Sequence, residues 1–193
     1  MKTTALFLLA SLLFYSCGED AASKKLASDT EARVTASIQQ LLVQAGDKAG
    51  TTSYIIAVHN WYQSDVPNLI KLNPKAETIY KTHAAILQEV AANEPKLVKH
   101  SSLRPEQAEG IRSGYKKLVD ESAARVQELS ALATSETTMS EAEQLKYVSD
   151  LADKQTHHLA LVKYFTKRTA NTLALREQEK RGQQYRLENF GHY

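Results

Sequence analysis

The single cysteine of this sequence, Cys17, has the setting of a lipid-attachment site. It follows an apolar run over residues 5–15, which has the length of the hydrophobic region of an export signal, and Lys2 supplies the positive start that such signals carry. A lone thiol in this place is suited to diacylation, with the chain cut just before it. We therefore predict that residues 1–17 form a lipoprotein-type signal peptide ending at Cys17, which carries the lipid.

The residues next to Cys17 bear on this prediction. Ser16 suits the position before the cleavage site, whereas Phe14 stands where lipoprotein signals usually carry an aliphatic residue. The acidic pair Glu19–Asp20 resembles the surface-export signal of Bacteroidetes lipoproteins. The alternative is an ordinary cleaved signal that leaves Cys17 as a free thiol. Because the apolar run is too short to span about 30 Å of hydrocarbon, it is not a membrane anchor by itself.

The positions of the histidines give little support to a metal site or a catalytic site. His157 and His158 are adjacent on an expected helix, so their side chains point about 100° apart and cannot hold one ion together. Asp153 and His157 are spaced to share a metal, but the pair lacks further ligands. His83 lies on an apolar stripe, which favours a hydrogen-bonded core histidine over a general base. No zincin, nucleophile-elbow or phosphate-loop motif occurs in the sequence. We predict no metal, no cofactor and no catalytic residue.

Three residues are candidates for a protein interface. Gly110 and Gly114 are four apart in an expected long helix, where each costs about 1 kcal/mol relative to alanine. Close approach of a neighbouring helix would explain them, and so would a docking groove for another subunit. Trp61 stands beside the buried stripe of its helix. It is either an exposed interface anchor or a partly buried cover over a helix junction.

Composition limits the classes of function. The chain has 24 Lys and Arg against 22 Asp and Glu, with no basic stripe, so electrostatics do not favour nucleic-acid binding. One cysteine allows no intramolecular disulfide. Stability must therefore come from packing, and the chain is long enough for one domain with a core.

Apolar residues recur at three and four positions, which indicates helices throughout. After a polar tether at 18–27, we place N-terminal helices in 28–100: one capped by Ser28 with Glu31 and stopping at Gly46, one from Thr52 towards Pro67, and one starting at Asn73–Pro74. We expect residues 93–105 to be the loosest segment of the chain.

Two long helices follow in the sequence. The first runs from Pro105 to about Thr134, and the second starts at a capping box of Ser140 and Glu143. The second has an almost heptad-like stripe and no helix breaker before Gly182. A short polar linker joins them, so we predict an antiparallel hairpin over 101–182 followed by a C-terminal tail at 183–193. The fold class is all-α: an elongated helical bundle dominated by this hairpin, with coiled-coil-like packing.

The C-terminal half resembles a known family. The similarity runs in order through Gly114-Tyr115-Lys116-Lys117-Leu118, Glu121-Ser122, Val126, Glu128-Leu129, Met139 to Glu143, and Leu161 to Thr166. It resembles the TraI-type transfer proteins of Bacteroidetes conjugative transposons, regarded as TrbJ-like minor-pilin components of type IV secretion systems. The resemblance implies a helical, non-enzymatic part of a conjugation apparatus. The family has no catalytic motif, and its members usually carry a plain cleaved signal, from which Cys17 departs.

The sequence therefore predicts a non-enzymatic component of a conjugative type IV secretion apparatus, minor-pilin-like or an envelope scaffold. Its expected partners are other subunits of the complex and the membrane, through the lipid on Cys17, and an oligomer is possible. We expect an exported outer-membrane lipoprotein facing the periplasm or the cell surface, or alternatively a periplasmic or pilus-associated protein. The rival function is a stand-alone outer-membrane lipoprotein that binds a ligand or polymer.

Overall fold

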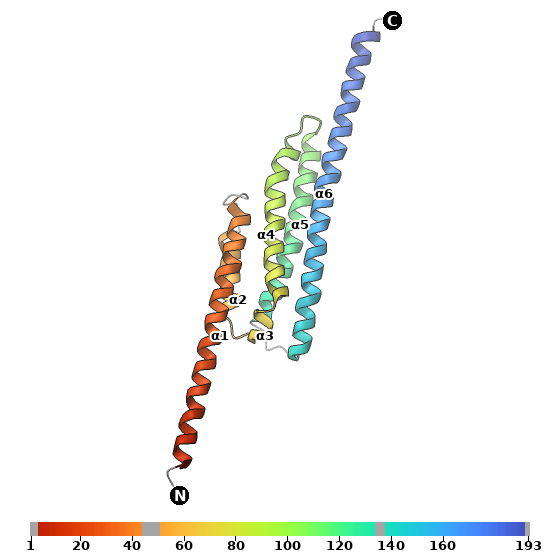
Figure 1. Cartoon of the computed structure of the whole chain (residues 1–193). Coiled ribbons are helices and arrows are strands. Elements are labelled where there is room, and N and C mark those ends of the chain that lie inside the picture. The colour runs from red at the N-terminus through yellow and green to blue at the C-terminus, as the bar shows by residue number, and fades with distance from the viewer. Residues whose placement is uncertain (1–3, 44–50, 134–137, 192–193) are drawn as a thin grey trace.

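The computed structural model describes the backbone of residues 4–43, 51–133 and 138–191, and the side chains of these ranges from residue 21 onward. Within these residues the chain forms six helices and no strand. They are α1 (Thr4–Val43), α2 (Thr51–Gln63), α3 (Asn68–Lys71), α4 (Pro74–Val98), α5 (Pro105–Ala131) and α6 (Glu141–Phe190). The molecule is an elongated bundle (Figure 1), so the predicted all-α class is confirmed.

Helix α4 is the central element of the bundle. It lies between α1 and α2 on one side and α5 and α6 on the other (Figure 1), and it packs against α1, α5 and α6. Because it has neighbours on two sides, its buried positions cover more than one stripe: Ala76, Ile79, Tyr80, Thr82, His83, Ala84, Ile86, Val90 and Leu97. Helices α5 and α6 run in opposite directions, but they form a three-helix unit with α4 rather than a hairpin that stands alone.

The core consists of two apolar clusters along the bundle. The larger joins α1 and α2 to α4 and to the ends of α5 and α6 near their connection, with Trp61, Tyr62, Tyr80 and Leu129 among its largest fully buried side chains. The smaller lies near the α4–α5 turn and consists of Ile86, Val90, Leu97, Tyr115, Val162 and Leu173. The α4–α5–α6 unit is therefore packed along most of its length.

Local signals predicted three helix starts correctly. The Asn73 side chain accepts a hydrogen bond from the Lys75 N–H at 2.9 Å, and Pro74 begins α4. Pro105 begins α5, where its missing N–H removes no helix hydrogen bond. Ser140 and Glu143 form the predicted capping box at the start of α6. The predicted stop at Gly46 and part of the α5–α6 linker lie outside the described residues.

The prediction of a polar tether at 18–27 is wrong, because these residues belong to a helix. Helix α1 runs without interruption from Thr4 to Val43, so no helix begins at Ser28. Residues 19–27 contain neither proline nor glycine and are rich in alanine and lysine, which are good helix formers. Polar composition therefore did not mean a break in the helix.

Two later boundaries also differ from the prediction. Residues 93–98 belong to α4, which accommodates Pro95 one turn from its end and is held there by the buried side chain of Leu97. The expected tail at 183–193 is helical as far as Phe190. Gly182 costs about 1 kcal/mol in a helix, and its neighbours are strong helix formers, so the helix continues through it.

Prolines placed at two sites of α6 test this architecture. Val148→Pro should lower the free energy of unfolding by about 3 kcal/mol or more, because it breaks the helix at a fully buried position. Gln184→Pro lies in the exposed end of α6 and should leave the unfolding midpoint unchanged, with only a small loss of helical circular dichroism. Equal destabilisation by the two prolines would mean that the end of α6 is part of the cooperative fold.

Candidate functional site

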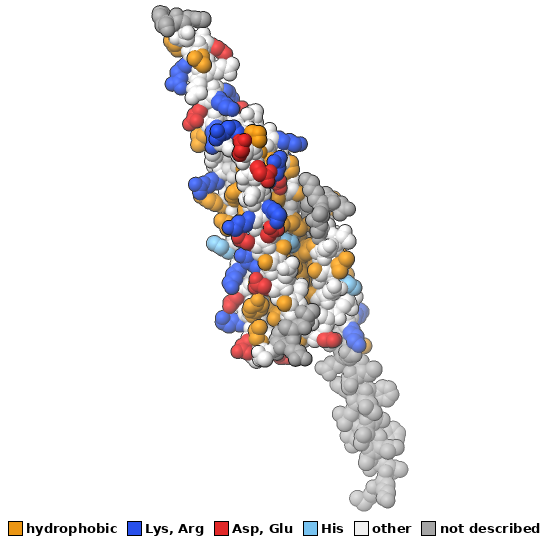
Figure 2. Space-filling view, turned by 180° about the vertical axis from the view of Figure 1, so that it is seen from behind, with side chains coloured by type: hydrophobic (Ala, Val, Ile, Leu, Met, Phe, Trp, Pro, Cys, Tyr) orange, Lys and Arg blue, Asp and Glu red, His pale blue; other side chains and the backbone are white. Residues whose placement is uncertain are grey.

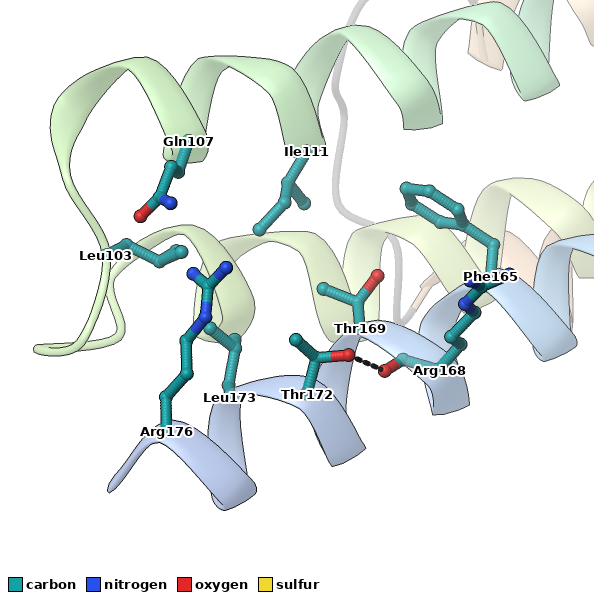
Figure 3. A pocket seen from close by; sticks show the side chains of 9 residues that line it. All are labelled: Leu103, Gln107, Ile111, Phe165, Arg168, Thr169, Thr172, Leu173 and Arg176. Carbon is teal, nitrogen blue, oxygen red and sulfur yellow. Dashed lines mark hydrogen bonds between the residues drawn. The ribbon is translucent and has the colours of Figure 1, made fainter. Parts of the chain in front are cut away.

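A groove of about 360 Å³ lies where α6 passes the start of α5 (Figure 3). Its volume is in the lower range of small-molecule pockets in proteins. The turn after α4 contributes one lining residue, α5 contributes two and α6 contributes six: Leu103, Gln107, Ile111, Phe165, Arg168, Thr169, Thr172, Leu173 and Arg176. We take this groove as a candidate binding site because it combines apolar side chains with two arginines.

Hydrogen bonds hold the α4–α5 turn in place beside the groove. The Leu103 N–H donates to the His100 carbonyl at 3.0 Å, and the Ser102 N–H donates to His100 Nδ1 at 3.2 Å. The Gln107 side-chain oxygen accepts from the Arg104 N–H at 3.1 Å, which caps the first turn of α5. These bonds position Leu103 and Gln107 at one end of the groove (Figure 3).

Gly114 allows Phe165 to pack closely against α5 beside the groove. A Cβ atom at Gly114 would lie 2.7 Å from Cζ of Phe165, which is too close for an unshifted ring. The Phe165 ring meets Tyr115 edge-on, with centroids 5.0 Å apart, and the Tyr115 hydroxyl lies 2.8 Å from Oγ1 of Thr166. Of the two explanations for Gly114, the close approach of a neighbouring helix is the one observed.

Gly110 does not share this role. It is exposed, and a Cβ atom there would meet nothing within 4 Å. The predicted ridge of two glycines is therefore not a common packing surface, and only Gly114 contributes to the α5–α6 contact.

The groove carries positive charge at its rim. Among the described residues, neither Arg168 nor Arg176 makes an ion pair. The nearby carboxylate of Glu177 instead lies 3.5 Å from both His100 and Arg181. Arg176 is half-buried while Arg168 is exposed. A ligand in the groove would thus meet two guanidinium groups whose charge is not neutralised by a carboxylate contact.

Trp61 is not an exposed anchor, so this alternative is wrong. Its side chain is only 1% exposed, and its indole N–H donates to the Lys71 carbonyl at 3.3 Å. The Lys71 ammonium donates in turn to the Ser64 carbonyl at 2.8 Å, and burial lowers the pKa of Lys71. Trp61 therefore covers the junction between α2 and α3, which was the other interpretation of this residue.

A buried polar cluster joins the three main helices. His83 of α4 is 5% exposed, and its Nδ1 lies 2.7 Å from Oγ of Ser122 in α5. The Gln155 amide of α6 donates to the same Oγ at 2.6 Å. This confirms His83 as a hydrogen-bonded core histidine.

Sequence reasoning missed the burial of His158. Its side chain is 3% exposed, and its Nε2 lies 2.7 Å from the Leu118 carbonyl. His157 is exposed, as expected for a solvated histidine, and Asp153 pairs with Lys75 at 2.7 Å. The spacing from Gln155 to His158 is the helical repeat of the buried stripe, and this signal could have separated His158 from His157.

The described part of the chain offers neither a metal site nor a membrane span. No group of three or more His, Cys, Asp or Glu side chains there is arranged to hold a metal ion. In the same residues no helix has the length and apolarity needed to cross a bilayer. Cys17 lies in α1, but its side chain is outside the described residues. The chain matches no protein-family model, no curated protein and no solved structure.

Alanine at the two glycines tests the packing role of Gly114. Gly110→Ala should raise the free energy of unfolding by about 0.5–1 kcal/mol, because it restricts the unfolded chain and meets open space. The free energy of unfolding of Gly114→Ala should be lower than that of Gly110→Ala by about 1 kcal/mol or more, because the Phe165 ring must shift. In a Phe165→Ala background the two substitutions should have equal effects. A difference that persists there in urea unfolding would exclude Phe165 as its cause.

The pKa of His83 predicts a loss of stability in acid. Burial, with a smaller effect of His158, lowers this pKa from 6.5 to about 4. The unfolded chain therefore binds more protons than the folded one between these values, and stability falls as the pH drops from about 6.5 to 4, by about 3 kcal/mol. Unfolding of His83→Gln should lack this dependence, while the exposed control His157→Ala should retain it. A wild-type stability that is flat over this range would contradict a neutral buried His83.

Proposed function

We propose that the protein is a non-enzymatic, lipid-tethered component of an envelope assembly for conjugative DNA transfer, of the type IV secretion class. The observation that carries this proposal is the arrangement of the two longest helices. Helix α6 continues past its last buried residue, Leu173, at one end of the bundle, and the part of α1 before Ala27, which includes Cys17, extends from the other end (Figure 1). A chain of this shape is suited to hold one end at a membrane and to present the other to a partner.

The projecting end of α6 is suited to contact another protein. Its large apolar side chains are exposed: Leu175 by 61%, Tyr185 by 62%, Leu187 by 70% and Phe190 by 66%. An isolated helical segment of this length is marginal in water, because most helical stability in proteins comes from packing. A partner that covers these side chains would supply the missing packing.

The charges of this end favour a protein partner over nucleic acid. Positive and negative side chains are interleaved along the end of α6 (Figure 2). Arg176, Lys180, Arg181 and Arg186 alternate with Glu177, Glu179 and Glu188. Nucleic-acid binding requires a positive surface that follows the phosphates. A mixed surface instead suits another helix of mixed charge.

The proposed lipid on Cys17 would attach the α1 end of the molecule to the membrane. From Cys17 to Val43, helix α1 spans about 39 Å at 1.5 Å per residue. Ala27 is the first buried residue among the described side chains of α1, and the helix packs in the bundle from there. With the chain cut before Cys17, only residues 17–26, about 15 Å of helix, would lie between the lipid and the bundle. The resemblance of the C-terminal half to TraI-type transfer proteins supports the assignment to conjugation, and the two-ended shape supports a scaffold.

Transfer assays with complemented deletion strains test this proposal. Deleting the gene in donor cells should abolish transfer of the conjugative element, and the wild-type gene should restore it. Cys17→Ser should move the protein from the membrane to the soluble fraction, remove labelling by a clickable fatty acid and fail to restore transfer. A chain ending at Glu179 lacks Tyr185, Leu187 and Phe190 of the exposed end of α6 and should remain in the membrane but also fail to restore transfer.

The matched control is His157→Ala, which changes an exposed residue of α6 within the bundle. It should restore transfer fully. Normal transfer in the deletion strain would exclude a role in conjugation. Loss of transfer in His157→Ala, with normal transfer by the chain ending at Glu179, would point to chemistry in the bundle rather than a scaffold.

A further inference from the structure

The floor of the groove beside α6 is apolar and continuous with the smaller core cluster. Leu173 belongs to that cluster, and Leu103, Ile111 and Phe165 pack against it. These four residues come from three separate segments and face the same space (Figure 3). The groove is thus a place where the core is incompletely covered, and an apolar chain lying in it would remove this surface from water.

The two ends of the groove differ in their polar groups. Arg176 and Gln107 lie at the end near the α4–α5 turn, and Phe165 and Arg168 lie at the other (Figure 3). Arg176 is half-buried against the groove, and in the described residues no carboxylate pairs with it. The Gln107 oxygen is used by the Arg104 N–H, which leaves its amide N–H groups as donors. Arg168 is exposed and can be solvated without a ligand.

We propose that this groove binds the anion of a single-chain fatty acid. The carboxylate accepts hydrogen bonds from the Arg176 guanidinium and the Gln107 amide, and the alkyl chain lies along Leu103, Ile111 and Leu173 towards Phe165. A guanidinium binds a carboxylate well because its N–H groups match the two oxygens. The Thr172 hydroxyl donates to the Arg168 carbonyl at 2.9 Å, so its methyl group is left to line the groove.

The dimensions favour one alkyl chain. A groove of about 360 Å³ is in the lower range of ligand pockets, which suits a ligand with a single alkyl chain. Fatty-acid binding is independent of the proposed role in transfer, so an experiment can contradict one without contradicting the other. A protein that binds no fatty acid still supports transfer by the proposed role, and a protein unrelated to transfer still binds the acid.

Calorimetric titration of the purified mature chain with laurate, below its critical micelle concentration, tests the proposal. Wild type should bind one laurate. Arg176→Gln should weaken binding about tenfold, because it removes a charge-assisted hydrogen bond. Arg186→Gln removes the same charge from α6 beyond the groove and should bind as wild type does. Thr169→Phe places a ring in the groove and should abolish binding, while its circular dichroism stays unchanged.

Ligand variants separate this occupant from others. Octanoate should bind at least tenfold more weakly than laurate, because each buried methylene contributes to affinity. Dodecyltrimethylammonium, with the same chain length and a positive head, should not compete. The proposal is overturned if wild type does not bind laurate, if Arg176→Gln binds it equally well, or if the cationic surfactant competes. Binding of a lysophospholipid in place of laurate would also overturn it.

Discussion

Helix α4 must be covered on two sides at once, and the rest of the fold is arranged around this requirement. Its buried residues face α1 on one side and the α5–α6 pair on the other. The hydrophobic effect drives this packing, and ion pairs lie at its edges. Arg33 of α1 pairs with Glu77 of α4 through two contacts of 2.8 Å, and Lys75 of α4 pairs with Asp153 of α6 at 2.7 Å. These pairs orient helices whose association is apolar.

The buried polar cluster sets how the three main helices align. Ser122 receives the Gln155 amide of α6 and contacts His83 of α4, so one hydroxyl joins all three helices. Sliding one helix by a turn would leave these groups buried without partners, at a cost of about 1–3 kcal/mol for each group. Apolar contacts alone tolerate such shifts more easily. The alignment in turn brings Ile111 of α5 and Leu173 of α6 to the same groove.

Local rules predicted the helix starts, and the failures share one physical cause. Asn73–Pro74, Pro105 and Ser140 with Glu143 satisfy or remove N–H groups within a few residues, so the sequence contains the whole signal. The tether at 18–27 was expected because that segment is polar, and the tail at 183–193 was expected because Gly182 was read as the end of the helix. A helix ends only where hydrogen bonds are broken or replaced, however, and solvated charged residues continue it readily.

The sequence did not predict the sites that are assembled from several helices. In the sequence, Trp61 stands beside the predicted buried stripe of its helix. This position did not reveal that α3 places the Lys71 carbonyl beside the indole N–H of Trp61. For Gly114 the sequence left open a close helix approach or a docking groove, and it did not indicate that Phe165 of α6 packs there. The groove was not predicted at all, because Leu103, Ile111 and Leu173 become neighbours only once three segments are aligned. Such sites depend on tertiary contacts for which a single sequence carries no local signal.

The last part of α6 has no role in this packing. Leu173 is its last buried residue, and the core cluster and the groove floor both end there, yet the helix continues to Phe190. The continuation exposes Leu175, Leu187 and Phe190 among charged neighbours, so these side chains add no apolar burial to the monomer. In the proposed function, this is the segment that would contact a partner. Arg176 lies where the groove ends and this segment begins, so the two surfaces adjoin but use different residues of α6.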